Sequence, residues 1–273
     1  MPITEKIHGT NHGKIHYFVC CIDPKLPWLV FLPGLTADHH LFDKQIEELG
    51  LRFNCLVWDA PAHGASRPFA LKFSMDDLAQ YLHDILQAEE IRKPVLIGQS
   101  LGGYLSQVYM EHYPNTVSGF ISIDSCSMQR KYYTSAELWL LKHTKGMYLS
   151  IPWKLLIKWG SLGNAQTLYG RNLMRQTMES YDKGEYCALA DHGFRILAEA
   201  VEANRPYHIS CPVLLICGEK DNAGSARRYN RNWNQQTHYP LVWVPAAGHN
   251  SNTDDPSFVN DRIEAFVSAL FSA

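Results

Sequence analysis

The chain has 273 residues, of which 46% are hydrophobic and 19% are charged, and its 25 basic and 27 acidic residues give a formal net charge of −2. This composition is typical of a globular protein with a full hydrophobic core and excludes a disordered chain. The basic residues are mixed with acidic ones, without the basic block that marks a nucleic-acid surface, so we expect no nucleic-acid partner.

The cysteines and the amino-terminal residues indicate the compartment. Seven cysteines is an odd number, no pair has the spacing of a zinc site, and Cys55, Cys211 and Cys217 lie in or beside apolar runs. These features favour reduced, buried thiols. Residues 1–6 lack the apolar run of a signal peptide, and no uncharged stretch reaches the length of a membrane span. We therefore expect a cytoplasmic protein without stable membrane insertion, and the sequence leaves its oligomeric state open.

Apolar segments and helical patterns alternate along the first half of the chain. Strands are predicted over residues 14–20, 28–32, 54–58, 95–97 and 117–123. A helix capped by Ser74 precedes the fourth of these strands, and a second helix follows it and ends at Pro114. Strands that alternate with helices form parallel sheets that bind ligands at the carboxyl ends of their strands. We therefore predict an α/β fold with a mostly parallel, twisted sheet and helices on both of its faces.

The alternation is interrupted between Ser125 and Pro206, where helical patterns rich in aromatic residues replace the strands. The aromatic residues are Tyr132, Tyr133, Trp139, Tyr148, Trp153, Trp159, Tyr169, Tyr181, Tyr186 and Phe194. Helix breaks are predicted at Gly146, at Pro152, at 160–163 and at Gly184. We expect most of the aromatic rings to hold these helices together and the others to line an apolar pocket.

The basic residues of the same segment allow two interpretations. Lys142, Lys145, Lys154 and Lys158 stand among apolar residues. This pattern fits docking at a membrane surface, and it fits equally lysines that extend from the surface of a helical layer into water. From the sequence we favour the second interpretation.

The alternation of strands and helices resumes after residue 206. Strands are predicted over 212–217 and 241–244, with a helix containing Arg227 and Trp233 between them and an amphipathic helix at the end. We therefore predict one structural domain, in which residues 1–125 and 206–273 form the core and residues 126–205 form a helical cap inserted between late strands.

The segment Gly98-Gln99-Ser100-Leu101-Gly102 lies where a buried strand meets a helix. A tight corner holds the serine hydroxyl clear of the main chain, and only very small residues fit on either side of it. The helix that follows directs free amide groups and its positive dipole end toward an anion formed at this corner. The motif resembles the nucleophile elbow of the α/β-hydrolase family, and from about Lys14 onward the chain is similar to that family.

Two further residues complete a candidate catalytic set. Asp221 and His249 follow Ser100 in the order nucleophile, acid, histidine, and each lies in a loop after a predicted strand. A serine hydroxyl becomes a good nucleophile when an imidazole takes its proton, and a carboxylate fixes the imidazole tautomer. Asp124 also ends a predicted strand, at a position that some relatives use for the acid. We predict Ser100, Asp221 and His249, with Asp124 as the alternative acid and Glu219 as a weaker one.

The resemblance also assigns two loops. The family draws one donor of its oxyanion hole from the loop after the second predicted strand, where Pro33 replaces the usual histidine. By position, the backbone amides of Leu35 and Leu101 are the expected donors. Residues 59–66 resemble a loop that is mainly structural in relatives, with Ala62 where glycine is usual, so Asp59 and His63 are left out of the catalytic set.

Other histidines offer no metal site. His39 and His40 are adjacent, and His8, His12 and His16 span a predicted turn instead of one helix face. Neither arrangement suits a shared metal ion, so no metal and no cofactor are expected.

The resemblance implies a serine hydrolase. It would cleave a small carboxylic ester or related acyl substrate with an apolar part, through an acyl-enzyme on Ser100. The same residues also serve hydrolysis of a carbon–carbon bond in a β-diketone, opening of a lactone and cleavage of a thioester, and the triad does not separate these reactions. A non-catalytic ligand receptor on the same fold is a further alternative that intact Ser100, Asp221 and His249 disfavour.

Overall fold

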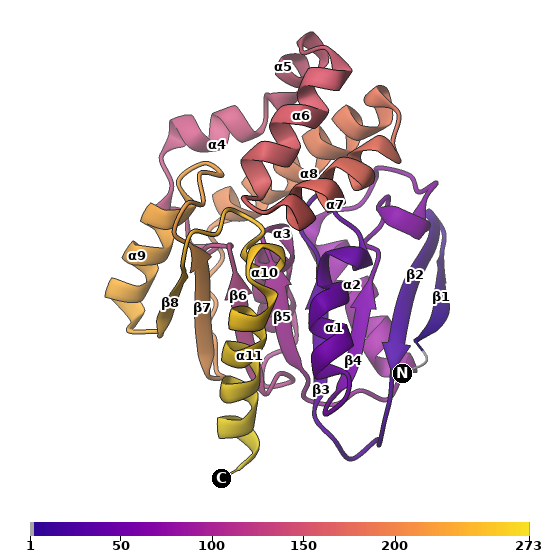
Figure 1. Ribbon diagram of the computed structural model, residues 1–273, viewed down its shortest axis with the longest axis vertical. Coiled ribbons are helices and arrows are strands. Elements are labelled where there is room, and N and C mark those ends of the chain that lie inside the picture. The colour runs from indigo at the N-terminus through magenta and orange to yellow at the C-terminus, as the bar shows by residue number, and fades with distance from the viewer. Residues whose placement is uncertain (1–2, 273) are drawn as a thin grey trace.

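A computed structural model describes residues 3–272, which form an eight-stranded sheet with helices on both faces and a further layer of helices at one edge (Figure 1). The predicted core range begins and ends with residues 1, 2 and 273, which lie outside this description. The strands are β1 (Thr4–Thr10), β2 (Gly13–Cys20), β3 (Trp28–Leu32), β4 (Asn54–Trp58), β5 (Val95–Gln99), β6 (Gly119–Ile123), β7 (Val213–Gly218) and β8 (Leu241–Val244).

The sheet has the strand order β1-β2-β4-β3-β5-β6-β7-β8. Strands β3 to β8 run parallel, whereas β2 pairs antiparallel with β1 and with β4. Every residue of the central strands β4, β5, β6 and β7 is buried, which explains their continuous apolar sequences. The predicted fold class, a mostly parallel α/β sheet, is confirmed.

Strand β1 was not predicted from the sequence. It forms an edge hairpin with β2, and most of its side chains are exposed. An edge strand with few buried positions needs no apolar alternation, so its sequence, TEKIHGT, carries no strand signal.

Two apolar layers cover the sheet, because alternate strand residues point to opposite faces. Val30 and Leu56 pack with residues of α2, α3 and α9 in one layer. Phe31 and Val57 pack with residues of α1 and α11 in the other. The helices of the core are α1 (Asp43–Leu49), α2 (Met75–Ala88), α3 (Leu101–His112), α9 (Ala226–Thr237), α10 (Ser251–Asp254) and α11 (Pro256–Phe271).

The segment between β6 and β7 contains five helices and lies over the carboxyl ends of the parallel strands (Figure 1). These helices are α4 (Ser135–Leu141), α5 (Thr144–Ser150), α6 (Trp153–Asn164), α7 (Leu168–Glu179) and α8 (Lys183–Ala203). We call residues 126–205 the helical insertion. Within residues 3–272, no helix is both long and apolar enough to cross a membrane.

The predicted helix breaks were correct only at Pro152, which is the residue before α6. Gly146, Gly160, Gly163 and Gly184 all lie inside helices. A single glycine costs a helix about 1 kcal/mol, which tertiary packing offsets. Gly160 is an example: α7 packs so closely against it that a Cβ at this position would lie 2.7 Å from the sulfur of Met178.

Candidate active site

Ser100 lies at the corner between β5 and α3 in a strained backbone conformation. Its φ and ψ are 49° and −118°, in the left-handed half of the map that a serine rarely adopts. The N–H of Ser100 donates a hydrogen bond of 2.9 Å to the carbonyl of Ile123 at the end of β6. This bond and the start of α3 hold the corner and leave the hydroxyl turned away from the main chain.

The two glycines of the motif are required by close backbone approach. A Cβ on Gly98 would overlap the backbone of Gly102 and Gly103, and a Cβ on Gly102 would overlap the carbonyl oxygen of Leu32. Helix α3 therefore packs directly against the ends of β5 and β3. No other residue type fits this corner without moving it.

We expect Gly102→Ala to lower the free energy of unfolding by at least about 3 kcal/mol, because the new methyl group overlaps backbone that cannot rotate away. The matched control is Gly146→Ala in α5, where nothing lies within 4 Å of the new Cβ. It should stabilise the protein by about 0.5 to 1 kcal/mol through helix propensity. Urea unfolding measures both changes, and equal effects at the two positions would contradict the packing described.

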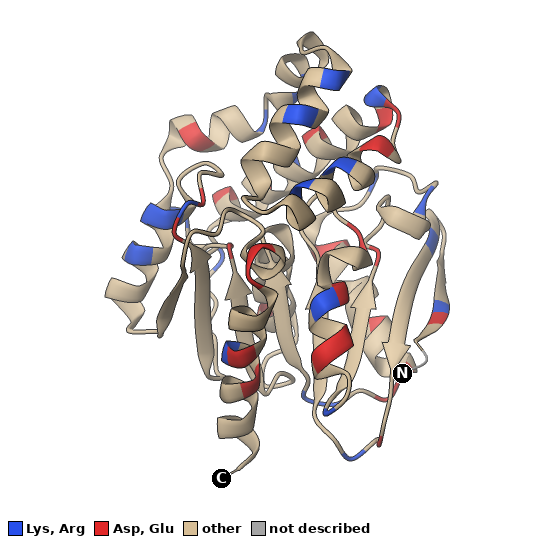
Figure 2. Cartoon of the chain, viewed as in Figure 1, with Lys and Arg blue, Asp and Glu red and all other residues tan. Residues whose placement is uncertain are grey.

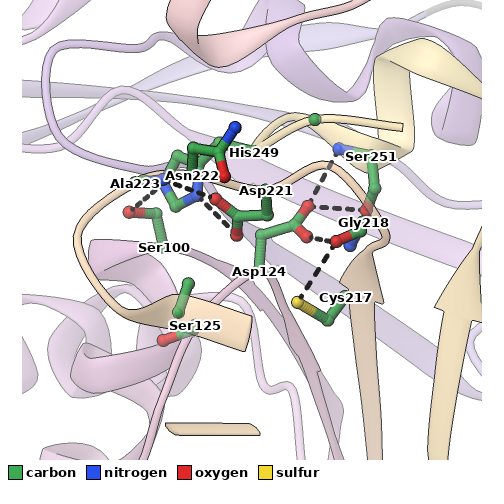
Figure 3. Close-up of polar contacts among 12 residues, drawn as sticks. Ser100, Asp124, Ser125, Cys217, Gly218, Asp221, Asn222, Ala223, His249 and Ser251 are labelled. Carbon is green, nitrogen blue, oxygen red and sulfur yellow. Dashed lines mark hydrogen bonds and ion pairs between the residues drawn. The ribbon is translucent and has the colours of Figure 1, made fainter. Parts of the chain in front are cut away.

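Ser100, His249 and Asp221 come together at the carboxyl ends of β5, β8 and β7 (Figure 3). The Oγ of Ser100 lies 3.0 Å from Nε2 of His249, and Nδ1 of His249 lies 3.0 Å from Oδ2 of Asp221. Asp221 is fully buried, and its other oxygen accepts a hydrogen bond of 2.8 Å from the N–H of Ala223. The arrangement gives the serine a proton acceptor and gives the imidazole a fixed orientation.

The electrostatics of His249 favour its protonated form. Burial alone would lower its pKa, but the charge of Asp221 and the hydrogen bond to that residue outweigh burial, and Asp124 adds to their effect. The pKa of His249 is therefore raised above the ordinary value of 6.5. An imidazole with a raised pKa is a stronger base toward the hydroxyl of Ser100.

Asp124 lies beside Asp221 and makes no hydrogen bond to the histidine (Figure 3). Its Oδ1 accepts from the N–H of Gly218 at 2.7 Å, and its Oδ2 accepts from the N–H and the hydroxyl of Ser251 at 2.8 and 2.6 Å. Burial and the nearby charge of Asp221 raise the pKa of Asp124. Asp124 thus joins the loop after β7 to the turn after His249. Glu219 is exposed and accepts a hydrogen bond from the N–H of Ala246.

Gln99 and Asp254 hold the loop that carries His249, and sequence reasoning missed both. The side-chain amide of Gln99 donates a hydrogen bond of 2.8 Å to the carbonyl oxygen of His249. The carboxylate of Asp254 accepts from the N–H groups of Gly248, Gln166 and Thr167 at 2.7 to 2.9 Å, which joins this loop to the helical insertion. Gln99 occupies the variable position of the elbow motif, and Asp254 lies five residues beyond His249. Neither position carries a signal that is readable without the fold.

The backbone amides of Leu35 and Leu101, which were predicted as oxyanion-hole donors, belong to segments beside Ser100. Leu101 is the first residue of α3, so its N–H has no acceptor within the helix. No hydrogen bond inside residues 3–272 uses the N–H of Leu35. A Cβ on Gly34 would lie 3.0 Å from the Cβ of Ser100, which places this loop beside the serine. Gly193 of α8 packs against the side chain of Leu35 and holds the loop from above.

Asp59 and His63 lie outside the Ser100 cluster. Asp59 is buried and accepts hydrogen bonds from the N–H groups of His39 and Ala65, both at 2.7 Å, and it contacts the ring of His39 at 2.9 Å. Burial lowers the pKa of His63 to about 4, so this ring is neutral. Asp59 therefore fastens two loops at one end of β4.

One group of potential metal ligands occurs among residues 3–272. The ligand atoms of Asp124, Cys217 and Asp221 lie within 4.8 Å of one another. The carboxylates already accept the hydrogen bonds described above, and burial strongly raises the pKa of the Cys217 thiol, which points to the carbonyl of Gly218. A thiol rather than a thiolate is a poor metal ligand, so the group is better explained as hydrogen-bonded packing.

A cavity of about 530 Å³ lies between Ser100 and the helical insertion. Ser100 and His249 contribute to its wall, and so do five of the ten aromatic residues of the insertion, which is more than the minority expected from the sequence. These five are Tyr133, Tyr148, Trp159, Tyr186 and Phe194. A cavity of this size suits a small organic molecule.

The cavity lining includes the titratable residues Asp124, Glu137 and His249 but neither Lys nor Arg. Burial opposes the charge of Glu137, yet hydrogen bonds from Tyr229, Thr134 and Ser225 lower its pKa to about 2. Glu137 also pairs with Arg228 at 2.6 Å. Its charge is thus already compensated by groups of the protein.

Comparison with known proteins gives three kinds of similarity. The alpha/beta hydrolase fold model matches residues 27–147, which include Ser100. The chain is 23% identical to a 2-(acetamidomethylene)succinate hydrolase of Mesorhizobium japonicum, over 89% of this chain and 88% of that protein. It is 33% identical over 99 residues to a 2-succinyl-6-hydroxy-2,4-cyclohexadiene-1-carboxylate synthase of Shigella dysenteriae, over 36% of this chain and 35% of that protein.

A solved structure matches over almost the whole chain. The enol-lactonase of Burkholderia xenovorans LB400 superposes with a TM-score of 0.80 at 18% identity, covering 96% of this chain and 100% of that one. Together with the strand order of the sheet, these findings confirm the predicted fold family and the predicted class of enzyme, a hydrolase of that family. The chain has the α/β-hydrolase fold, and its residues 27–147 match the model of that family.

Proposed function

We propose that the protein is a serine hydrolase that cleaves a small carboxylic ester or related acyl compound with an apolar part. One observation carries the proposal: the hydrogen-bonded series Ser100, His249 and Asp221 lies at the base of a cavity whose lining includes seven aromatic residues. A partly apolar cavity above an activated serine suits acyl transfer to that serine followed by hydrolysis.

The geometry supports a two-step reaction. His249 takes the proton of Ser100 as its Oγ attacks the substrate carbonyl, and the amides of Leu35 and Leu101 stabilise the resulting oxyanion. His249 then gives the proton to the leaving alcohol, and the acyl group remains on Ser100. A water molecule, deprotonated by His249, releases the acid and regenerates the serine. Asp221 holds the imidazole tautomer throughout.

A cavity lining without lysine or arginine supports a neutral substrate. The similar proteins of M. japonicum and S. dysenteriae are named for substrates that carry carboxylates. A carboxylate bound inside a protein needs a cationic partner, usually arginine or lysine. The lining of this cavity includes neither, so we expect uncharged acyl and alcohol groups.

The activity should depend on the protonation of His249. The imidazole accepts a proton only when neutral, so kcat/KM should rise with pH, with a midpoint above 6.5 because Asp221 raises the pKa of His249. In Asp221→Asn the charge is lost while burial remains, and the midpoint should move to lower pH. A pH profile of p-nitrophenyl butyrate hydrolysis measures this midpoint. A wild-type midpoint at or below 6.5 would contradict the proposed coupling.

A substrate series tests the proposed function. Each methylene group buried in the cavity contributes about 0.8 kcal/mol, so kcat/KM for p-nitrophenyl esters should rise nearly fourfold per carbon until the cavity is full and then fall sharply. The hemisuccinate ester, which matches the butyrate ester in length but ends in a carboxylate, should be a much poorer substrate than the butyrate. If the hemisuccinate is preferred, the neutral-substrate assignment is wrong.

Lactones, thioesters and β-diketones of matched size belong in the same series, because the same triad can act on each of them. If one of these classes is turned over much faster than the esters, the proposed reaction would be replaced by that one, and the proposed catalytic residues would stay the same. Absence of Ser100-dependent turnover of every class would contradict the proposed enzyme and favour a ligand receptor.

A further inference from the structure

The outer faces of the helical insertion are unusually apolar. Fourteen large hydrophobic side chains are exposed among residues 3–272, and nine of them lie between residues 139 and 169. They are Trp139, Leu140, Met147, Leu149, Leu155, Trp159, Leu162, Leu168 and Tyr169. Isolated exposed hydrophobic residues are normal, but such a concentration in one segment marks an interaction surface.

Helix α6 shows the pattern most clearly. Leu155, Trp159 and Leu162 follow one another at spacings of four and three residues, so they form a single stripe, and Trp159 is 55% exposed. Leu156 and Ile157 are buried on the opposite side of the helix and account for its packing on the protein. The helix thus has a second apolar face that is about half exposed.

The charged residues of the segment that carries this apolar surface are all basic. Residues 138–178 include four lysines and two arginines but no aspartate or glutamate, although the whole chain is slightly acidic. Figure 2 shows basic but no acidic residues on α5 and α6. Lys145, Lys154 and Lys158 are exposed, and none of them forms an ion pair with another residue of the described chain.

The apolar surface is continuous with the candidate active site. Leu140, Met147 and Trp159 are about half exposed, and all three also line the cavity above Ser100. They come from α4, α5 and α6, so the cavity opens among these helices. We call these three residues, together with Leu155 and Leu162, the mouth surface.

We propose that the mouth surface docks on an anionic phospholipid membrane, so that the cavity opens toward the lipid. The membrane interface supplies both chemistries that the surface requires: an apolar layer for Trp159 and Leu155, and negative headgroups for the lysines. A second copy of the chain fits less well, because a symmetric dimer would bring the same lysines together from both subunits. Docking of this kind is peripheral and needs no spanning helix.

The test is co-sedimentation of the full chain with vesicles of phosphatidylcholine alone or mixed with phosphatidylglycerol. Ser100→Ala protein is used, so that binding is measured without turnover and does not depend on the proposed hydrolase activity. We expect binding to the mixed vesicles, little binding to phosphatidylcholine, and weaker binding at about 0.5 M salt, where charges are screened over a few ångströms.

Three double variants locate the surface. Lys154→Glu with Lys158→Glu should weaken binding by about 25-fold or more, since each lysine near an anionic surface contributes about fivefold. Leu155→Ser with Leu162→Ser removes apolar contact at residues outside the cavity and should also weaken binding. Lys25→Glu with Lys93→Glu is the control: it makes the same change in net charge at exposed positions before β3 and β5, at the opposite edge of the sheet.

Three outcomes would overturn the proposal. They are absence of binding to the mixed vesicles, an equal loss in the control, and a dimer in light scattering that the Leu155 and Leu162 changes dissociate. The last result would assign the surface to contact between copies. Thermal unfolding of each variant verifies that the fold is retained.

Discussion

Replacing Ser100 by alanine is expected to reduce kcat by about a million-fold, the loss found when a serine protease triad loses its nucleophile. The hydroxyl provides the attacking oxygen, and no other group lies 3.0 Å from Nε2 of His249 among the described hydrogen bonds. Alanine keeps the Cβ and adds no atom at the strained corner. The thermal midpoint should therefore change little, and steady-state kinetics with thermal unfolding measures both quantities.

Ser125→Ala is the matched control. Ser125 lies close to the same corner and is buried, and its hydroxyl makes no hydrogen bond to another described residue (Figure 3). Its removal should leave kcat within a fewfold of the wild-type value. A Ser100→Ala variant that retains a tenth of wild-type activity would contradict the covalent mechanism.

The second large effect separates the two buried aspartates. Asp221→Asn should lower kcat by about four orders of magnitude, because an amide at this position favours the wrong tautomer of His249. Asp124→Asn should have a small effect on kcat and a larger one on stability. Asp124 accepts three hydrogen bonds from Gly218 and Ser251, and an asparagine has only one oxygen to accept them.

Kinetics and urea unfolding of both variants measure these effects. If Asp124→Asn is inactive while Asp221→Asn retains activity, then Asp124 is the acid and the geometry described here has been misassigned. A loss of four orders of magnitude in both would mean that the two carboxylates act as one unit.

The sequence was most informative where one local rule determines the structure. Gly98 and Gly102 predict the corner at Ser100, because only glycine permits the close backbone approach found there. Ser74 predicts the start of helix α2, and its side chain forms a capping box with Asp77. Asp221 and His249 were predicted because each lies in a loop that follows a strand, β7 and β8 respectively.

Features that depend on distant parts of the chain were not readable. The amide of Gln99 meets His249 from 150 residues away, and the carboxylate of Asp254 joins the histidine loop to the helical insertion. Gly160 was taken as a helix break because its tertiary partner, Met178, lies in another helix. The exposed apolar stripe of α6 was also not predicted, because the sequence pattern of this helix does not indicate which of its apolar faces is buried.

Labelling with a fluorophosphonate probe, followed by mass spectrometry of the digested protein, tests the central claim most directly. The probe forms a covalent bond only with an activated serine and needs no knowledge of the substrate. The account predicts one adduct per chain, on the peptide that contains Ser100, and little labelling of His249→Ala under the same conditions. An unlabelled wild-type protein, or an adduct on another serine, would contradict it.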